Sequence, residues 1–66
     1  IIIFESPFRV LATLKELYEL LGNREIAIGR EMTKLHEEYI HTTLENAINE
    51  IENRQKIQGE FTIIVS

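Results

Sequence analysis

Ionisable side chains are concentrated in one stretch of the sequence, where six of the nine residues from Arg30 to Glu38 can carry a charge. The stretch continues to His41 and follows the apolar run from Ile26 to Gly29, which has the composition of a buried strand. A buried strand that ends in charged residues holds polar groups at a rigid position, as a binding or catalytic site requires. We therefore take this stretch as the candidate functional segment.

The charged residues of the segment allow more than one interpretation. Arg30 and Lys34 can bind an anion such as a phosphate, or Arg30 can form an internal ion pair with Glu37 across a hairpin. Glu37 and Glu38 can act as an acid/base pair. However, neighbouring side chains of a strand point to opposite faces, which favours a solvated edge instead.

Motifs for metals and nucleotides are incomplete in this sequence. His36 and His41 could share an ion with Glu37, yet adjacent strand residues diverge and no further ligand is evident, so we predict no metal site. The three glycines lie at positions 22, 29 and 59, which is too widely spaced for a phosphate-binding loop. The residue types alone therefore specify no activity.

The remaining sequence predicts the framework that positions this segment. Residues 1–5 form a short apolar run rich in β-branched residues, which indicates a buried strand. Ser6-Pro7 is typical of the start of a helix, and apolar residues then recur every three or four positions as far as Leu21. Gly22 is typical of the helix end, and a second strand follows at 26–29.

The second half of the chain predicts a further strand, helix and strand. Aromatic and β-branched residues favour a strand at 37–42, paired as a hairpin with the second strand through a connection at 32–35. Thr42 and Glu45 have the spacing of a capping box, so the next helix should begin there, and 60–65 is the last strand. The element order is β-α-β-β-α-β, an α/β (α+β) domain with a mixed four-stranded sheet and two helices.

Length and charge restrict the classes of function. The chain has 66 residues and a net charge of −4, so it forms one domain at most. Its seven Lys and Arg residues are scattered, whereas a nucleic-acid-binding domain presents a basic surface to phosphates. There is no cysteine, and no apolar run approaches the about 20 residues of a membrane span. These features predict a cytoplasmic location and no membrane contact.

Three segments of the sequence resemble a known family. They are Phe4-Glu5-Ser6-Pro7-Phe8-Arg9, Arg30-Glu31-Met32-Thr33-Lys34-Leu35-His36-Glu37-Glu38 and Gly59-Glu60-Phe61. In these residues the chain is similar to the C-terminal domain of the tetrapyrrole (corrin/porphyrin) methylase superfamily, and within it to the branch that methylates small-subunit ribosomal RNA. The resemblance implies that residues 1–66 are a truncated C-terminal domain, without the N-terminal cofactor domain of the enzyme.

The resemblance also implies a function and a set of site residues. The parent enzyme is expected to be a homodimer that transfers a methyl group from S-adenosylmethionine, held between its two domains, to a ribose 2′-oxygen of ribosomal RNA. Alternatives are a tetrapyrrole C-methyltransferase and a non-enzymatic ferredoxin-like module for ligand binding or dimerisation. The catalytic candidates are Lys34 and Arg30, and the fragment alone is expected to be inactive. The residues expected at the cofactor and substrate cleft are Glu5, Ser6, Arg9, Arg30, Glu31, Thr33, Lys34 and Glu37.

Two strand orders are compatible with this succession of elements. The resemblance implies the spatial order first, fourth, second, third, with the last two strands antiparallel to the first two. The pattern alone favours the ferredoxin-like order fourth, first, third, second. The first strand distinguishes them, because it lies at an edge in one order and between two strands in the other.

Overall fold

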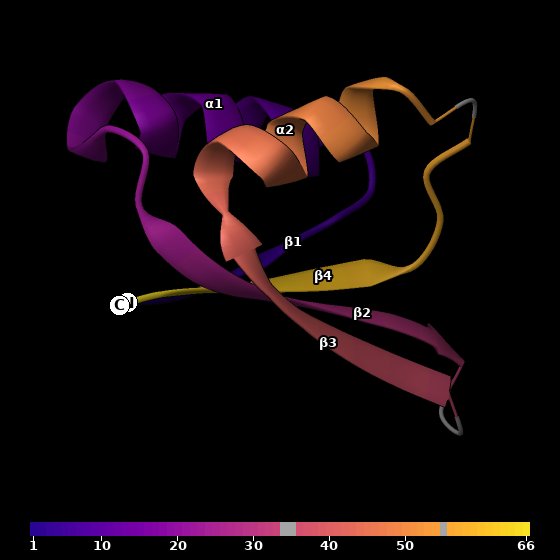
Figure 1. The fold of residues 1–66 in the computed structure, drawn as a ribbon. Coiled ribbons are helices and arrows are strands. Elements are labelled where there is room, and N and C mark those ends of the chain that lie inside the picture. The colour runs from indigo at the N-terminus through magenta and orange to yellow at the C-terminus, as the bar shows by residue number, and fades with distance from the viewer. Residues whose placement is uncertain (34–35, 55) are drawn as a thin grey trace.

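The chain forms one antiparallel sheet of four strands, with both helices on the same face (Figure 1). The computed structural model describes residues 1–33, 36–54 and 56–66. In chain order the elements are β1 (Ile2–Glu5), α1 (Val10–Leu21), β2 (Glu25–Thr33), β3 (His36–Thr43), α2 (Leu44–Glu52) and β4 (Glu60–Val65). The predicted order β-α-β-β-α-β and the α+β fold class are confirmed.

The sheet has the order β1-β4-β2-β3, so β1 lies at an edge and β4 in the interior. This is the order implied by the family resemblance, and the ferredoxin-like order favoured by the pattern is wrong. β1 and β2 run in the same direction, but β4 separates them, and every hydrogen-bonded pair of the described strands is antiparallel. The expected mixed sheet is wrong in this respect, because a parallel pair would require β1 and β2 to be neighbours.

The core lies between the two helices and the sheet. Helix residues that recur every three or four positions face alternate residues of the strands, so each element buries one side. The buried apolar residues are Val10, Leu14 and Leu17 in α1, Leu44, Ala47 and Ile51 in α2, and Ile26, Phe61, Ile63 and Val65 in the sheet. Burial of one such large side chain contributes about 1.5–3 kcal/mol, and together these residues hold the helices on the sheet.

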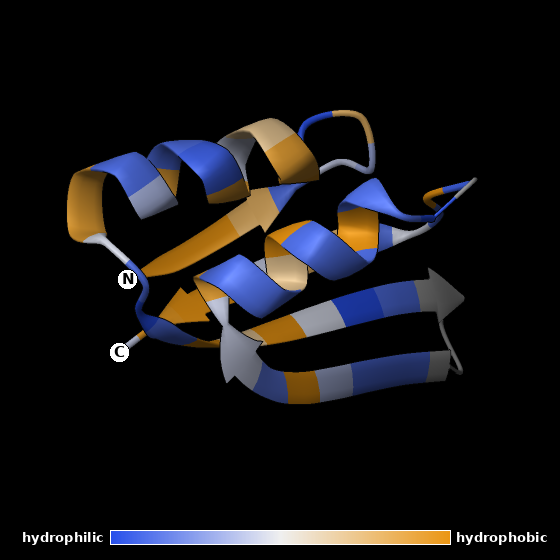
Figure 2. Ribbon diagram, turned by 45° about the horizontal axis from the view of Figure 1, so that its top comes forward, coloured by the Kyte–Doolittle hydropathy of each residue, from blue (hydrophilic) through white to orange (hydrophobic). Residues whose placement is uncertain are grey.

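The opposite face of the sheet is not covered by any described helix or strand (Figure 1). Apolar residues nevertheless run along β1 and β4, while hydrophilic residues gather toward the free end of the β2–β3 hairpin (Figure 2). The side chains of Phe4 and Ile2 are 77 % and 62 % exposed. The buried strand expected at 1–5 is therefore wrong, because β1 is an edge strand and only its alternate residues face the helices.

The first helix begins later than the sequence predicts. Its first residue is Val10 and its N-cap is Arg9, whereas the prediction placed the cap at Ser6. The Ser6 carbonyl accepts hydrogen bonds from the amides of Arg9 and Val10, so residues 7–9 form a turn that precedes the helix. The predicted end is confirmed: Gly22 has a φ of 76°, and its amide donates to the Tyr18 carbonyl.

The second helix is capped from two places. Its N-cap is Thr43, not the predicted Thr42, and Thr43 Oγ1 accepts a hydrogen bond of 3.2 Å from the Asn46 amide. Asn23, in the loop after α1, supplies the other cap. Its Oδ1 accepts from the Glu45 amide at 3.0 Å, and its Nδ2 donates to the Glu45 carboxylate at 3.2 Å. Glu45 is thus bound to Asn23 and does not complete a capping box.

The second strand is longer than the sequence predicts. The prediction ended it at Gly29, but β2 continues to Thr33. Arg30 and Glu31 therefore lie inside the sheet and have register partners on both neighbouring strands, which satisfies their backbone groups. Of the connection predicted at 32–35, the first two residues belong to β2 and the last two lie outside the described residues.

The other two predicted strands agree closely with the structure. The strand predicted at 37–42 is β3, which has one more residue at each end. The strand predicted at 60–65 has the bounds of β4. The hairpin of β2 and β3 thereby carries the charged segment that the sequence singled out.

Candidate functional site

The three segments that carry the family resemblance meet at one end of the sheet. Since β1 and β2 run in the same direction, their C-terminal ends lie together, on either side of the start of β4. One row across the sheet joins Glu5, Phe61, Arg30 and Glu38, each in register with the next. Each segment therefore contributes to this row, although the segments are far apart in the sequence.

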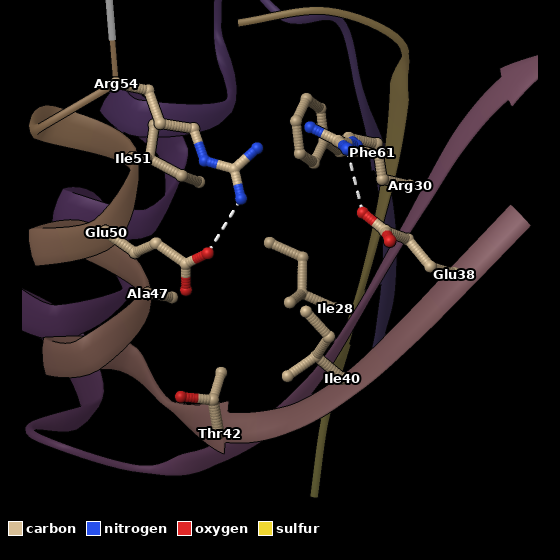
Figure 3. A pocket seen from close by; sticks show the side chains of 10 residues that line it. All are labelled: Ile28, Arg30, Glu38, Ile40, Thr42, Ala47, Glu50, Ile51, Arg54 and Phe61. Carbon is tan, nitrogen blue, oxygen red and sulfur yellow. Dashed lines mark hydrogen bonds and ion pairs between the residues drawn. The ribbon is translucent and has the colours of Figure 1, made fainter.

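A small hollow lies on the helix side of this row, between α2 and the β2–β3 hairpin (Figure 3). Its volume is about 40 Å³, which is room for a few water molecules. Arg30 and Glu38 line it from the sheet, and Glu50 and Arg54 line it from the α2 side, so two ion pairs face each other across it (Figure 3). The remaining lining residues are Ile28, Ile40, Thr42, Ala47, Ile51 and Phe61.

Arg30 holds a largely buried guanidinium at this hollow. Its Nη2 lies 2.8 Å from Oε1 of Glu38, and its side chain is 20 % exposed. The Nε atom of Arg30 is buried and has no hydrogen-bond partner among the described residues. A buried donor of this kind requires an acceptor, such as a water molecule or a ligand oxygen. The arrangement thus offers a positioned positive charge with one donor still to be satisfied.

The second ion pair at the hollow is more exposed. Arg54 Nη2 lies 2.7 Å from Oε1 of Glu50, at the i,i+4 spacing of a helix. Arg54 lies beyond the end of α2, and exposed ion pairs of this kind contribute only about 0.2–1 kcal/mol. We therefore expect Arg54 and Glu50 to exchange their mutual contact for water or ligand contacts more readily than Arg30 and Glu38.

The first segment is anchored at the other edge of the row. The Thr13 hydroxyl donates a hydrogen bond to Oε2 of Glu5, and Arg9 Nε lies 3.9 Å from Oε1 of Glu5. The Glu5 side chain is mostly buried, whereas that of Arg9 is mostly exposed. Glu5 therefore ties β1 to α1, Ser6 contributes its carbonyl to the intervening turn, and Arg9 extends into solvent.

The predicted site residues are divided between the two faces of the sheet. Glu37 is in register with Glu31 on the face away from the helices, while Glu38 points into the hollow on the helix side. The expected divergence of Glu37 and Glu38 is confirmed. The predicted ion pair of Arg30 with Glu37 is wrong, because Arg30 and Glu38 share a row and a face.

Sequence reasoning missed the part of the site that α2 supplies. Glu50 of α2 and Arg54, two residues beyond the end of that helix, line the hollow, and their proximity to the hairpin depends on the fold. Of the other predicted residues, Thr33 ends β2 and Lys34 lies outside the described part of the chain. Within the described residues, no three His, Cys, Asp or Glu side chains are grouped so as to hold a metal ion.

Gly59 allows the third segment to approach the second. Its φ is 87°, in the left-handed region that side chains disfavour. A Cβ atom at this position would lie 2.6 Å from the Glu31 carbonyl oxygen and 3.2 Å from Cγ of Arg30. A larger residue would therefore separate the start of β4 from the strand that carries Arg30.

Comparison with known proteins gives the family context. No family model matches the chain. The chain is 44 % identical, over all 66 residues, to ribosomal RNA small subunit methyltransferase I of Thermotoga maritima. It is 42 % identical to the protein of that name in Hydrogenobaculum sp. and 45 % identical to that in Bacillus subtilis, each over 98 % of the chain. The chain is homologous to ribosomal RNA small subunit methyltransferase I.

The match covers only a part of each methyltransferase. The chain spans 29 % of the Thermotoga maritima protein, 28 % of the Hydrogenobaculum protein and 22 % of the Bacillus subtilis protein. The resemblance to ribosomal RNA small subunit methyltransferase I is confirmed for this segment, while the wider superfamily stays a prediction. Among the described helices, none has the length and apolar character needed to cross a lipid bilayer.

Proposed function

We propose that the chain is the C-terminal domain of an S-adenosylmethionine-dependent methyltransferase that acts on small-subunit ribosomal RNA. The observation that carries this proposal is the identity of 42–45 % to three methyltransferases of that name over nearly the whole chain. The convergence of the three family segments supports it, since residues of one site must meet in space. The acceptor that we propose is a ribose 2′-oxygen.

The hollow beside Arg30 does not enclose the cofactor by itself. The hollow beside Arg30 is about 40 Å³, far smaller than S-adenosylmethionine, and its charged groups are paired with each other. We therefore propose that the row of Glu5, Phe61, Arg30 and Glu38 belongs to one wall of a cleft. The N-terminal domain of the same protein would supply the opposite wall and most of the cofactor contacts.

Arg30 is the described residue best suited to act on the methyl acceptor. A guanidinium stays protonated and is not a base, but it can stabilise negative charge that develops on a ribose oxygen. Glu38 orients the group through Nη2, and Nε has no partner among the described residues, so a donor is positioned before a ligand arrives. Lys34, predicted from the sequence and outside the described residues, is the second candidate.

We expect the RNA to bind mainly through other parts of the protein. The net charge of −4 opposes the approach of phosphates, and phosphate contacts dominate the affinity of nucleic-acid-binding proteins. On this proposal the chain positions reacting groups and contributes little to affinity. The homodimer and the cytoplasmic location stay predictions.

The alternatives have less support. The relatives are named for ribosomal RNA and not for tetrapyrroles, which favours the RNA acceptor over C-methylation of a tetrapyrrole ring. A ferredoxin-like ligand-binding module would have β1 between β3 and β4, and β1 is an edge strand here.

The test is methyl transfer by the intact protein, with unmodified small ribosomal subunits and S-adenosylmethionine labelled in its methyl group. We expect the label at a ribose 2′-oxygen of the RNA. Arg30→Ala should lower kcat/KM by about 100-fold, as the loss of one transition-state donor does in other enzymes. Arg30→Lys should restore only part of the rate, because Lys cannot make two parallel hydrogen bonds. The matched control is Lys15→Ala on α1, which should leave the rate unchanged.

Two results would contradict this assignment. No label on the RNA, together with label on a tetrapyrrole offered in a parallel reaction, would support the alternative acceptor. An Arg30→Ala variant that is folded by circular dichroism and as active as wild type would exclude a role for Arg30. In that case Lys34→Ala is the variant that tests the remaining catalytic candidate.

A further inference from the structure

The face of the sheet opposite the helices, which we call the open face, has an apolar part and an acidic end. The apolar part consists of Ile2, Phe4, Tyr39 and Ile64, which lie in two adjacent rows across the strands. The acidic end is the next row, formed by Glu37, Glu31 and Glu60. The open face therefore changes from apolar to acidic along the direction of the strands.

The apolar part has the character of an interface. Phe4 and Tyr39 are aromatic and are 77 % and 59 % exposed, and neighbouring exposed apolar residues mark interaction surfaces in soluble proteins. The ring of Tyr39 lies over Gly29, in the space that a Cβ atom at this position would occupy. A hollow of about 120 Å³ is formed by Phe4, Tyr39 and the acidic end.

The acidic end is suited to bind a positively charged side chain. Glu31 lies in register between Glu37 and Glu60, and like charges placed side by side on neighbouring strands destabilise a sheet. A Lys or Arg side chain in the adjacent hollow would relieve this repulsion and could contact both aromatic rings through cation–π interactions. The same carboxylates oppose the approach of RNA phosphates and of an identical acidic surface.

The occupant that best fits is the remainder of the same protein. The chain spans only 22–29 % of three relatives, so most of each relative's length lies outside the matched segment. The helices already cover the other face of the sheet, which leaves the open face as the large apolar surface still available for packing. An antiparallel sheet that leaves one face to solvent carries polar residues on that face, so the apolar residues of the open face indicate that a further layer covers it.

We propose that the open face is an intramolecular docking surface for the part of the intact protein that lies outside these 66 residues. Apolar side chains of that part cover Phe4, Ile2 and Tyr39, and a basic side chain enters the hollow beside Glu31. This inference rests on the proposal that the chain is part of a longer methyltransferase. It is independent of the identity of the methyl acceptor.

The test is the reactivity of a thiol introduced on the open face, which the cysteine-free chain makes simple to follow. Phe4→Cys is prepared in the 66-residue chain and in the intact protein, and alkylation by iodoacetamide is mapped by mass spectrometry. We expect the thiol to react at least about tenfold more slowly in the intact protein, because access would require local opening of the contact. Leu20→Cys, on the exposed side of α1, is the control and should react equally in both.

A second variant tests the charge. Glu31→Lys in the intact protein should abolish the protection of the Phe4→Cys thiol, whereas Glu19→Lys on α1 should leave it in place. Equal reactivity of the Phe4→Cys thiol in the two proteins would overturn the proposal. Protection that is already present in the 66-residue chain and increases with its concentration would assign the open face to a second copy. Neither result depends on methyl transfer, so this test and that of the function fail separately.

Discussion

At the scale of single residues, the environment of Arg30 depends on which face of the sheet each glutamate occupies. Glu37 and Glu38 are adjacent in the sequence, yet one lies on the open face and the other binds Arg30 in the hollow. A shift of one residue in the pairing of β2 with β3 would exchange them. The sequence alone predicts that the two diverge, but not which one Arg30 binds, because that depends on the register.

The strength of this contact can be measured against a matched pair. Arg30–Glu38 and Lys15–Glu52 both have an N–O distance of 2.8 Å, but Arg30 is 20 % exposed and Lys15 is 53 % exposed. Because burial reduces screening by water, double-mutant cycles to Ala should give a coupling of about 1 kcal/mol for the first pair and below about 0.5 kcal/mol for the second. The free energies of unfolding come from urea titrations. Equal couplings would show that burial does not strengthen the contact of Arg30.

At the scale of elements, the loop after α1 also determines where α2 begins. The Arg24 carbonyl accepts from the Leu44 amide at 2.9 Å, and Asn23 binds both the amide and the carboxylate of Glu45. Two backbone amides and one carboxylate at the start of α2 are thus hydrogen-bonded to two residues that lie about twenty positions earlier. This long-range cap explains why the capping-box pattern, a purely local signal, places the N-cap one residue too early.

The contribution of this cap is accessible by substitution. Asn23→Ala removes both side-chain hydrogen bonds and should lower the free energy of unfolding by about 1 kcal/mol, the usual cost of losing an N-cap. Asn23→Asp keeps an acceptor for the Glu45 amide but places two carboxylates together, so its loss should be intermediate at neutral pH and smaller at low pH. Thermal unfolding followed by circular dichroism gives both values. An Asn23→Ala variant with an unchanged free energy of unfolding would mean that Thr43 alone caps α2.

Element types and their order follow from the sequence, whereas several boundaries do not. Apolar periodicity places both helices, and the β-branched run at 60–65 gives the bounds of β4 without error. The predicted start of the first helix is too early, because the Ser6 carbonyl accepts hydrogen bonds in a turn that precedes α1. The predicted second strand is too short, because the polar residues after Gly29 are stabilised by pairing with strands on both sides. Such pairing is a tertiary interaction, and no pattern in the strand's own sequence indicates it.

At the scale of the whole molecule, the proposed function makes the candidate site one wall of a cleft. The resemblance implied the strand order that the structure has, since the pattern alone favours a ferredoxin-like arrangement, and it placed Glu5 and Arg30 at one site. The contribution of α2 to the hollow and the exposure of the open face emerge only from the packing of the layers.

An incomplete site predicts weak binding by the chain in isolation. Calorimetric titration of the 66-residue chain with S-adenosylhomocysteine should show no binding in the micromolar range, because the hollow of about 40 Å³ cannot bury the ligand. The intact protein is the positive control under the same conditions. Micromolar affinity of the isolated chain would mean that the described residues hold the cofactor without a second wall.

The interior position of β4 has a consequence for how this segment acquires its structure on the ribosome. β4 is the last of the six elements to be synthesised, yet it is the strand that joins β1 to the β2–β3 hairpin. Until Val65 has left the exit tunnel, β1 has no hydrogen-bonded neighbour among these strands. Ile1–Glu5 therefore stays unpaired while some sixty further residues are added to the chain. The hairpin can form early, but the sheet closes in one late step, and until then an apolar strand of the nascent chain stays exposed.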